Sequence, residues 1–401
     1  YTVKQLTTSK DTTKVDDFTI KVYEMGEKIY YTISNAEITA KLKVVKIDKD
    51  TKQVITRKNI KFKIYNVDTK EYVKQTITYP TAKTIDVFET DSNGILITPY
   101  PLKAGTYYLE EVDQKIDGYL WNKNSVEFKI GEDSKLINDE EFGILFEVKF
   151  ENKAVKGSLE LTKTGEEVEL TDNGYIYTKI NLKGVKIGLY ARENIYDALG
   201  NLKYKKDTLV KELITDENGY VKVDNLYLGK YYLQEIETVN NHVLDKTKYE
   251  FELKYKDQYT EVINYKTTLE NHLPKGTLEF TKSDYSNSKT LPNTLIEIYN
   301  ENDELVYSGR TDENGKIIID KLPVGKYYIL EKEAPEGYKI NEEKMYFEIT
   351  EDGQAVKCNM LDEAYEVPNT GLSNFNYELI GSIVLIVSGL GLFLYGTKKR
   401  K

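Results

Sequence analysis

Charged side chains recur on the apolar face of several expected strands. Side chains alternate between faces along a strand, so residues two apart point the same way. A lysine follows an apolar stripe in Leu42-Val44-Lys46, Leu159-Leu161-Lys163 and Leu278-Phe280-Lys282. A glutamate does so in Tyr107-Leu109-Glu111, Tyr231-Leu233-Glu235 and Tyr327-Ile329-Glu331, and an asparagine in Val148-Phe150-Asn152 and Leu269-Asn271. We therefore expect repeated units that direct a Lys, a Glu and an Asn into their cores.

Burial changes the chemistry that such groups can do. An unpaired buried charge costs several kcal/mol or more, so it pairs, neutralises or reacts. Desolvation lowers the pKa of Lys and raises that of Glu. A neutral amine is a nucleophile, and a protonated carboxyl can donate to an Asn carbonyl oxygen and polarise the carbon for attack. Loss of ammonia would then leave a Lys–Asn amide. For one unit alone, a lysine that reaches the surface and pairs with a rim glutamate is the simpler interpretation, but the threefold recurrence favours the reaction.

Internal repeats define the units. Residues 150–163 align with residues 269–282, and residues 34–46 form a weaker copy. In each copy an Asn (35, 152, 271) precedes a Lys (46, 163, 282) by 11 positions. Repetition at a domain-sized period indicates a string of similar modules. We expect modules at 37–153, 154–272 and 273–366, with residues 1–36 as the last two strands of a preceding module, at 18–23 and 30–35.

Each module also contains an Asp-x-Asn-Gly segment ahead of its glutamate strand. These segments are Asp91–Gly94, Asp216–Gly219 and Asp312–Gly315. Asn-Gly between alternating apolar residues is a strong hairpin signal. A calcium loop would need further spaced oxygen ligands and a terminal Glu, which these segments lack, so we interpret them as turns.

Composition narrows the class of protein. The chain has 401 residues, 34 of them Tyr, and a net charge of −10 without a basic stripe. Tyr and β-branched residues favour strands, which predicts an all-β fold, and the charge pattern argues against a nucleic-acid partner. Two histidines and the single Cys358 leave no expected metal site, disulfide or cofactor. We find no Ser/His/Asp or Cys/His set and no phosphate-binding loop, so we do not expect an enzyme beyond self-crosslinking.

The last 35 residues contain a targeting pattern. Val367-Pro368-Asn369-Thr370-Gly371 precedes an uncharged stretch, Leu379–Tyr395, and a basic end, Lys398–Lys401. The 17 uncharged residues are at the short limit for a membrane-spanning helix, and the basic end favours the cytoplasm. The pentapeptide resembles the sorting signal of Gram-positive wall proteins, Leu-Pro-x-Thr-Gly. That resemblance implies a sortase that cleaves after Thr370 and joins it to an amine of peptidoglycan or of a pilus subunit, with only transient membrane insertion. An ordinary C-terminal membrane anchor is the alternative.

The modules resemble the B-type repeats of collagen adhesins and the SpaA-type domains of Gram-positive pilins. The family signature, Tyr-x-Leu-x-Glu followed by Ala-Pro-x-Gly-Tyr, corresponds to 327–331 and 334–338 in module three. Module one keeps only Gly118-Tyr119 of the second part, and module two lacks the second part altogether. The resemblance implies tandem immunoglobulin-like (prealbumin-like) sandwiches with spontaneous isopeptide bonds. By position, the nucleophiles would be Lys46, Lys163 and Lys282, the assisting carboxyls Glu111, Glu235 and Glu331, and the acceptors Asn152, Asn271 and Asn359. Asn359 needs a bulge to face inward.

These features predict the stalk of a wall-anchored adhesin or pilin on the outside of a Gram-positive cell. The chain begins at Tyr1 without a signal segment, and we expect any host or matrix ligand to bind a missing N-terminal region. The alternative is the anchor of a wall-bound enzyme whose catalytic domain lies upstream. A polymerising pilin also needs an acceptor lysine. Lys83, in Tyr79-Pro80-Thr81-Ala82-Lys83, is the candidate, although a simple surface lysine is the more ordinary reading.

Overall fold

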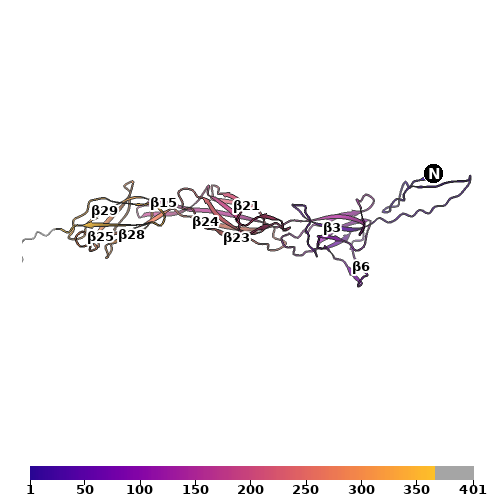
Figure 1. Ribbon diagram of the computed structural model, residues 1–401, viewed down its shortest axis with the longest axis horizontal. Coiled ribbons are helices and arrows are strands. Elements are labelled where there is room, and N and C mark those ends of the chain that lie inside the picture. Colours follow the sequence, from indigo (N-terminus) through magenta and orange to yellow (C-terminus); the bar gives the residue numbers. More distant parts are fainter. Residues whose placement is uncertain (366–401) are drawn as a thin grey trace, which may run out of the picture. The chain divides into compact units, whose positions relative to one another are not determined.

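The computed structural model describes residues 1–365, and these form an all-β protein without helices (Figure 1). The predicted fold class is therefore confirmed. Within residues 1–365 we find no helix whose length and apolarity would let it span a bilayer. The sorting signal, the apolar stretch and the basic end all lie outside the described residues. Two compact units are formed, one by residues 1–167 and 179–272 and the other by residues 168–178 together with those from 273 onward.

Module one is a sandwich of two sheets. One sheet has the order β10-β3-β14-β13 with β9 also on β3, and the other has the order β12-β11-β4-β5 with β8 on β4. The strands are β3 (Thr39–Asp48), β4 (Lys61–Asn66), β5 (Glu71–Tyr72), β8 (Phe88–Glu89), β9 (Ile95–Ile97), β10 (Leu102–Lys103), β11 (Gly105–Glu111), β12 (Val126–Ile130), β13 (Ile137–Asp139) and β14 (Gly143–Asn152). Leu42, Phe62, Leu109 and Phe150 are among the side chains that fill the space between the sheets.

A small hairpin extends from module one. It consists of β6 (Gln75–Ile77) and β7 (Lys83–Ile85), and it projects from the rest of the module in Figure 1. Lys83, the candidate pilin lysine, is exposed on this hairpin.

Module two repeats the arrangement. One sheet joins β16, β15 and β21, with β24 also on β15, and the other has the order β20-β17-β22-β23. The strands are β15 (Lys156–Thr171), β16 (Gly174–Asn181), β17 (Lys186–Ala191), β18 (Ile195–Tyr196), β19 (Leu202–Tyr204), β20 (Leu209–Ile214), β21 (Tyr220–Leu226), β22 (Gly229–Glu237), β23 (Tyr249–Leu253) and β24 (Val262–Asn271). β18 and β19 form a separate two-stranded sheet.

Module three has the simplest sandwich. Its sheets have the orders β28-β25-β31 and β27-β26-β29-β30. The strands are β25 (Lys275–Asp284), β26 (Leu295–Asn300), β27 (Leu305–Arg310), β28 (Lys316–Pro323), β29 (Gly325–Glu333), β30 (Met345–Ile349) and β31 (Ala355–Asp362).

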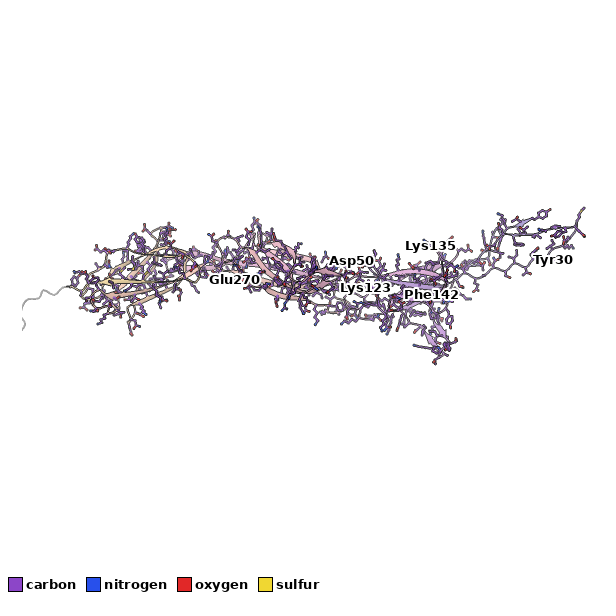
Figure 2. The ribbon with its side chains drawn as sticks, in the orientation of Figure 1. Tyr30, Asp50, Lys123, Lys135, Phe142 and Glu270 are labelled. Carbon is purple, nitrogen blue, oxygen red and sulfur yellow. The ribbon has the colours of Figure 1, made fainter. Side chains whose placement is uncertain are left out.

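The first and last strands of every module pair in parallel. These pairs are β3 with β14, β15 with β24, and β25 with β31. The alternation of side chains is clear near the end of β24, where Asn271 is buried while Glu270 is exposed and pairs with Lys179 (Figure 2). The C-terminal ends of the two strands therefore lie side by side, with alternate residues directed into the core.

The long hairpin of β15 and β16 belongs to two modules. Its base is part of module two, but residues 168–178 at its tip fall within the second compact unit. There Leu170 and Tyr175 pack against the core of module three, and the Tyr177 hydroxyl donates to the Lys321 carbonyl at 2.9 Å. Burial, and then Tyr175, raise the pKa of the Tyr327 hydroxyl above its ordinary value. The tip thus contributes apolar and polar contacts to the core of module three.

Residues 1–36 differ from the expected strand pair. Only β1 (Thr2–Val3) and β2 (Phe18–Thr19) form there, and they pair with each other. Tyr23 and Tyr30 are strongly exposed, so these segments bury little apolar surface. An isolated two-stranded ribbon is marginally stable at best. β2 therefore covers only the first two residues of the strand expected over 18–23, and no strand forms over 30–35.

Candidate crosslinking sites

Module one brings Lys46, Glu111 and Asn152 together in its core. The Lys46 ammonium donates to Asn152 Oδ1, and its Nζ lies 2.9 Å from Glu111 Oε1. Asn152 Nδ2 donates to both Glu111 oxygens, at 3.1 and 3.0 Å, and to the Leu120 carbonyl at 2.9 Å. The Lys46 and Glu111 side chains are both fully inaccessible to solvent. The lysine and the asparagine come from the parallel pair β3–β14, and the glutamate comes from the facing sheet.

Burial tunes the lysine toward reaction. Desolvation lowers the pKa of Lys46 to about 8, although Glu111 opposes the shift. The Phe62 and Phe150 rings lie beside the amine, with centroids 5.4 and 4.3 Å from Nζ. These aromatic walls exclude water and leave the glutamate as the charge partner. A substantial fraction of a lysine with this pKa is neutral, and hence nucleophilic, in mildly alkaline solution.

Module two brings together Lys163, Glu235 and Asn271. The Lys163 ammonium donates to Asn271 Oδ1 at 2.5 Å, and Asn271 Nδ2 donates to the two Glu235 oxygens at 2.8 and 3.0 Å. Burial lowers the pKa of Lys163 as well. One distance differs from module one, since Lys163 Nζ is 3.7 Å from Glu235 Oε1. The carboxyl is therefore close to the amide but beyond hydrogen-bond distance of the amine.

Module three corrects one predicted acceptor. Lys282 donates to Glu331 at 3.0 Å and to Asp362, not to Asn359. Asn359 is exposed on the opposite face of β31, where its Oδ1 accepts a hydrogen bond from the Ser283 hydroxyl at 2.6 Å. No bulge occurs in the register of β25 with β31, so parity keeps Asn359 outside.

The acceptor position becomes clear from strand register. Asn152 lies two residues beyond Phe150, the partner of Lys46, and Asn271 lies two beyond Leu269, the partner of Lys163. In module three the partner of Lys282 is Met360, so the corresponding residue is Asp362. A large apolar residue two positions before the acceptor is the sequence signal that would have found it.

Two carboxyls face one amine in module three. Burial raises the pKa of Glu331, and its hydrogen bond to Asp362 adds to the rise, whereas the Asn341 N–H and Lys282 oppose it. Like charges that share a buried site cannot all ionise at low cost. A proton shared between Glu331 and Asp362 leaves the group of three side chains neutral overall.

The Asp-x-Asn-Gly turns hold the three buried lysines. Each glycine carbonyl accepts a hydrogen bond from the backbone N–H of the lysine of its module, at 3.1 Å for Gly94, 2.7 Å for Gly219 and 2.8 Å for Gly315. The glycines have φ of +73°, +65° and +70°. A Cβ at Gly219 would lie 2.3 Å from the Lys163 carbonyl oxygen, so both the conformation and the close approach require glycine.

The orientation of the amides indicates how the glutamates could act. We expected a protonated Glu to donate to the amide oxygen, but in modules one and two the carboxyl contacts the amide nitrogen. This arrangement suits proton delivery to Nδ2 as the nitrogen leaves. A backbone N–H also fixes each carboxyl, from Asn122 at 3.1 Å, Asp245 at 2.8 Å and Asn341 at 2.8 Å.

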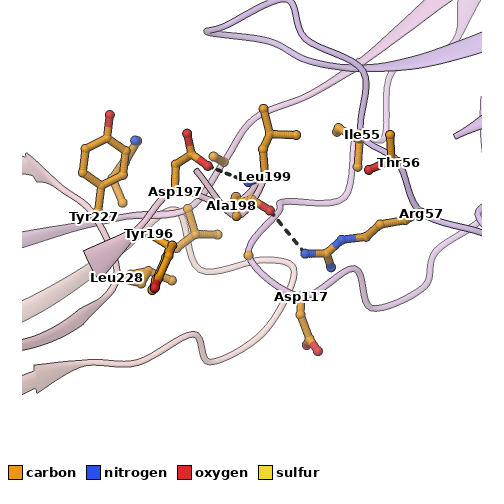
Figure 3. A pocket seen from close by; sticks show the side chains of 15 residues that line it. Ile55, Thr56, Arg57, Asp117, Tyr196, Asp197, Ala198, Leu199, Tyr227 and Leu228 are labelled. Carbon is orange, nitrogen blue, oxygen red and sulfur yellow. Dashed lines mark hydrogen bonds between the residues drawn. The ribbon is translucent and has the colours of Figure 1, made fainter. Parts of the chain in front are cut away.

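A separate cavity of about 430 Å³ lies in the first compact unit (Figure 3). Its charged groups have partners within the protein. Arg57 donates to the Ala198 carbonyl at 3.3 Å, and Asp197 accepts from the Leu199 N–H at 3.0 Å and pairs with Lys203 at 3.0 Å. Lys156 Nζ lies 3.7 Å from the centroid of the Tyr227 ring. None of the crosslinking residues lines this cavity.

Comparison with known proteins identifies the family. The family described as SpaA, prealbumin-like fold domain, matches residues 40–141, 157–268 and 276–364, which together cover more than half of the chain. The chain therefore belongs to the SpaA family of prealbumin-like fold domains. A search of curated proteins gave no match.

Several solved structures are similar to this chain. The Bacillus anthracis TIE protein is 27% identical with a TM-score of 0.51, over 82% of this chain and 52% of that one. This chain thus spans about half the length of the TIE protein. BcpA, the major pilin subunit of Bacillus cereus, is 15% identical with a TM-score of 0.36, over 81% and 99% of the two chains. A streptococcal ancillary pilin is 16% identical with a TM-score of 0.28, over 82% and 100%.

Proposed function

We propose that this chain is the structural stalk of a wall-anchored surface protein, an adhesin or pilin subunit, whose modules close intramolecular isopeptide bonds. The observation that carries the proposal is the buried triad of amine, carboxyl and acceptor. It recurs in all three modules at the end of the same parallel strand pair. Three buried amines without a ligand or a surface role are costly, and conversion into amides removes that cost.

The chemistry balances within each site. In module one Glu111 accepts the surplus lysine proton, and in module two Glu235 does so once it has closed its 3.7 Å distance from Nζ. The neutral Nζ then attacks the Asn carbonyl carbon, and the Nζ–Cγ bond forms as the Cγ–Nδ2 bond breaks. The carboxyl supplies the proton with which Nδ2 leaves as ammonia and takes the second proton from Nζ, so that the amide keeps one hydrogen and the glutamate ends protonated. In module three Glu331 takes the surplus lysine proton, the shared proton stays on Asp362, and the neutral Nζ attacks the Asp362 carboxyl carbon. The Nζ–Cγ bond forms as the Cγ–O bond breaks, and the Asp362 hydroxyl leaves as water with a proton that Nζ releases, while Glu331 ends protonated.

The position of the bond suits a protein under tension. In module one, force enters at the start of β3, runs to Lys46, crosses to Asn152 and leaves at the end of β14. Residues 47–151 lie outside this covalent path. The closed loop also removes unfolded-state entropy, about 5 kcal/mol if it behaves like a disulfide loop of that length.

Force spectroscopy of the full chain tests the stalk. The wild-type modules should lengthen only by the short segments outside their crosslinks. Lys46→Ala should add one unfolding event with the length of module one. A wild-type chain that shows the same unfolding event as Lys46→Ala would contradict the proposal.

Attachment is the second part of the proposal. The succession of sorting motif, uncharged stretch and basic end in the sequence of residues 367–401 supports it. A sortase would join the Thr370 carbonyl to an amine of peptidoglycan or of another subunit at the surface of a Gram-positive cell. Thr370→Ala should release the protein or leave it in the membrane, and wall digests that still contain residues 371–401 would contradict cleavage. The exposed Lys83 hairpin is the candidate acceptor for polymerisation. Loss of high-mass polymers in Lys83→Arg would favour a pilin over a monomeric adhesin.

A further inference from the structure

The leaving nitrogen has a different neighbour in module two than in module one. Besides Glu235, Asn271 Nδ2 donates to the Thr238 hydroxyl at 2.8 Å. In module one the corresponding nitrogen, Asn152 Nδ2, donates to the backbone carbonyl of Leu120 at 2.9 Å. Thr238 lies three residues after Glu235, and the corresponding residue of module one, Gln114, donates to the Asn59 carbonyl instead. Of these two sites, only that of module two therefore has a hydroxyl in contact with the leaving nitrogen.

The second site also has the weaker amine–carboxyl contact. Lys163 and Glu235 are 3.7 Å apart, whereas Lys46 and Glu111 are 2.9 Å apart. Proton transfer requires hydrogen-bond reach, so the carboxyl of module two is less well placed for the lysine proton. The position of the Asn271 amide therefore depends more on its other hydrogen-bond partner, the Thr238 hydroxyl.

We propose that Thr238 is a further catalytic residue of the module two crosslink, which holds the leaving nitrogen of Asn271 beside the Glu235 carboxyl. This inference rests on the proposed isopeptide chemistry. In the amide, Nδ2 donates to the Thr238 oxygen. Once Nζ of Lys163 has added to Cγ, Nδ2 becomes a basic amine. The Glu235 carboxyl, whose oxygens lie 2.8 and 3.0 Å from Nδ2, then donates the proton with which ammonia leaves, while the Thr238 oxygen keeps accepting from Nδ2 and holds the nitrogen in that position.

The test compares two bonds in one molecule. The full chain is synthesised in a short cell-free pulse and quenched in acid at intervals, and peptide mass spectrometry measures the Lys163–Asn271 and Lys46–Asn152 bonds. Thr238→Val and Thr238→Ala should slow formation of the Lys163–Asn271 bond about three- to tenfold, the effect of one lost hydrogen bond of about 1 kcal/mol. The Lys46–Asn152 bond should form at its wild-type rate. Thr238→Ser should restore the wild-type rate of formation of the Lys163–Asn271 bond.

A matched control and the contrary outcomes complete the design. Gln114→Val changes the corresponding residue of module one, which does not touch Asn152, and should alter neither rate. Wild-type rates in both Thr238→Val and Thr238→Ala would overturn the inference, as would a Thr238→Ser chain as slow as Thr238→Ala, because packing rather than the hydroxyl would then matter. Absence of both bonds from the wild-type chain would instead refute the proposed function.

Discussion

Modules one and three each bury a lysine at the corresponding position of their first strand, but they place it opposite different acceptors. In module one Lys46 meets one carboxylate and a neutral amide, so the buried charges balance. In module three Lys282 meets two carboxyls, and balance requires one shared proton. Both acceptors occupy the same register position on the last strand. The comparison teaches that the fold determines where the proposed bond would form, while the acceptor residue determines the leaving group and the protonation that the site needs.

Removal of the carboxyl should have the largest effect on module one. Glu111→Ala takes away the group that accepts and returns the proton, so the Lys46–Asn152 bond should fall below detection in peptide mass spectra. The Lys163–Asn271 bond should persist, because Glu235 serves its own core. Glu110→Ala is the control, since Glu110 lies on the other face and contacts the Tyr72 hydroxyl at 2.9 Å. Full crosslinking in Glu111→Ala would show that the carboxyl is dispensable.

The acceptor of module three can be tested by a pair of variants. Asp362→Ala should abolish the crosslink to Lys282, and Asn359→Ala should leave it intact, because only Asp362 faces the amine. Asp362→Asn should restore the neutral arrangement of module one and release ammonia instead of water. A crosslink that disappears in Asn359→Ala and survives in Asp362→Ala would return the assignment to Asn359.

A pH dependence should appear in module one when the bond cannot form. In Asn152→Ala, Lys46 stays a free amine whose folded-state pKa is lowered from 10.5 to about 8. The folded state then binds fewer protons than the unfolded state between these values, so the free energy of unfolding rises with pH across that window, by on the order of 3 kcal/mol. Hydrogen exchange of β3 and β14 in the full chain measures it. The wild-type amide should show no such rise, and a flat profile in Asn152→Ala would contradict the buried amine.

The hairpin tip should have a smaller effect that is confined to module three. Tyr175→Ala removes a side chain that packs against that core, which should destabilise module three by about 2 kcal/mol. Faster hydrogen exchange in β26 and β29, with β17 and β22 unchanged, would show it. Ile176→Ala is the control because Ile176 is exposed on the same hairpin. Equal exchange in both variants would mean that the tip adds little to the core.

Much of the site follows from sequence because a strand has a period of two. Parity places Lys46, Glu111 and Asn152 inside without any knowledge of the sheets. At Asn359 the expected bulge was wrong, because β31 pairs with β25 without a register shift, and parity keeps this residue outside. Choosing Asp362 requires the partner of Lys282, which parity alone does not provide. The role of Thr238 and the packing of Tyr175 depend on contacts between strands that are distant in sequence, and no local pattern in the chain indicates them.

Mass measurement tests the central claim most directly. The intact wild-type chain, purified without reaction partners, should weigh less than its sequence by two molecules of ammonia and one of water, and fragmentation should join Lys46 to Asn152, Lys163 to Asn271 and Lys282 to Asp362. A mass equal to that of the sequence, with the three lysines free in the peptide map, would contradict the account.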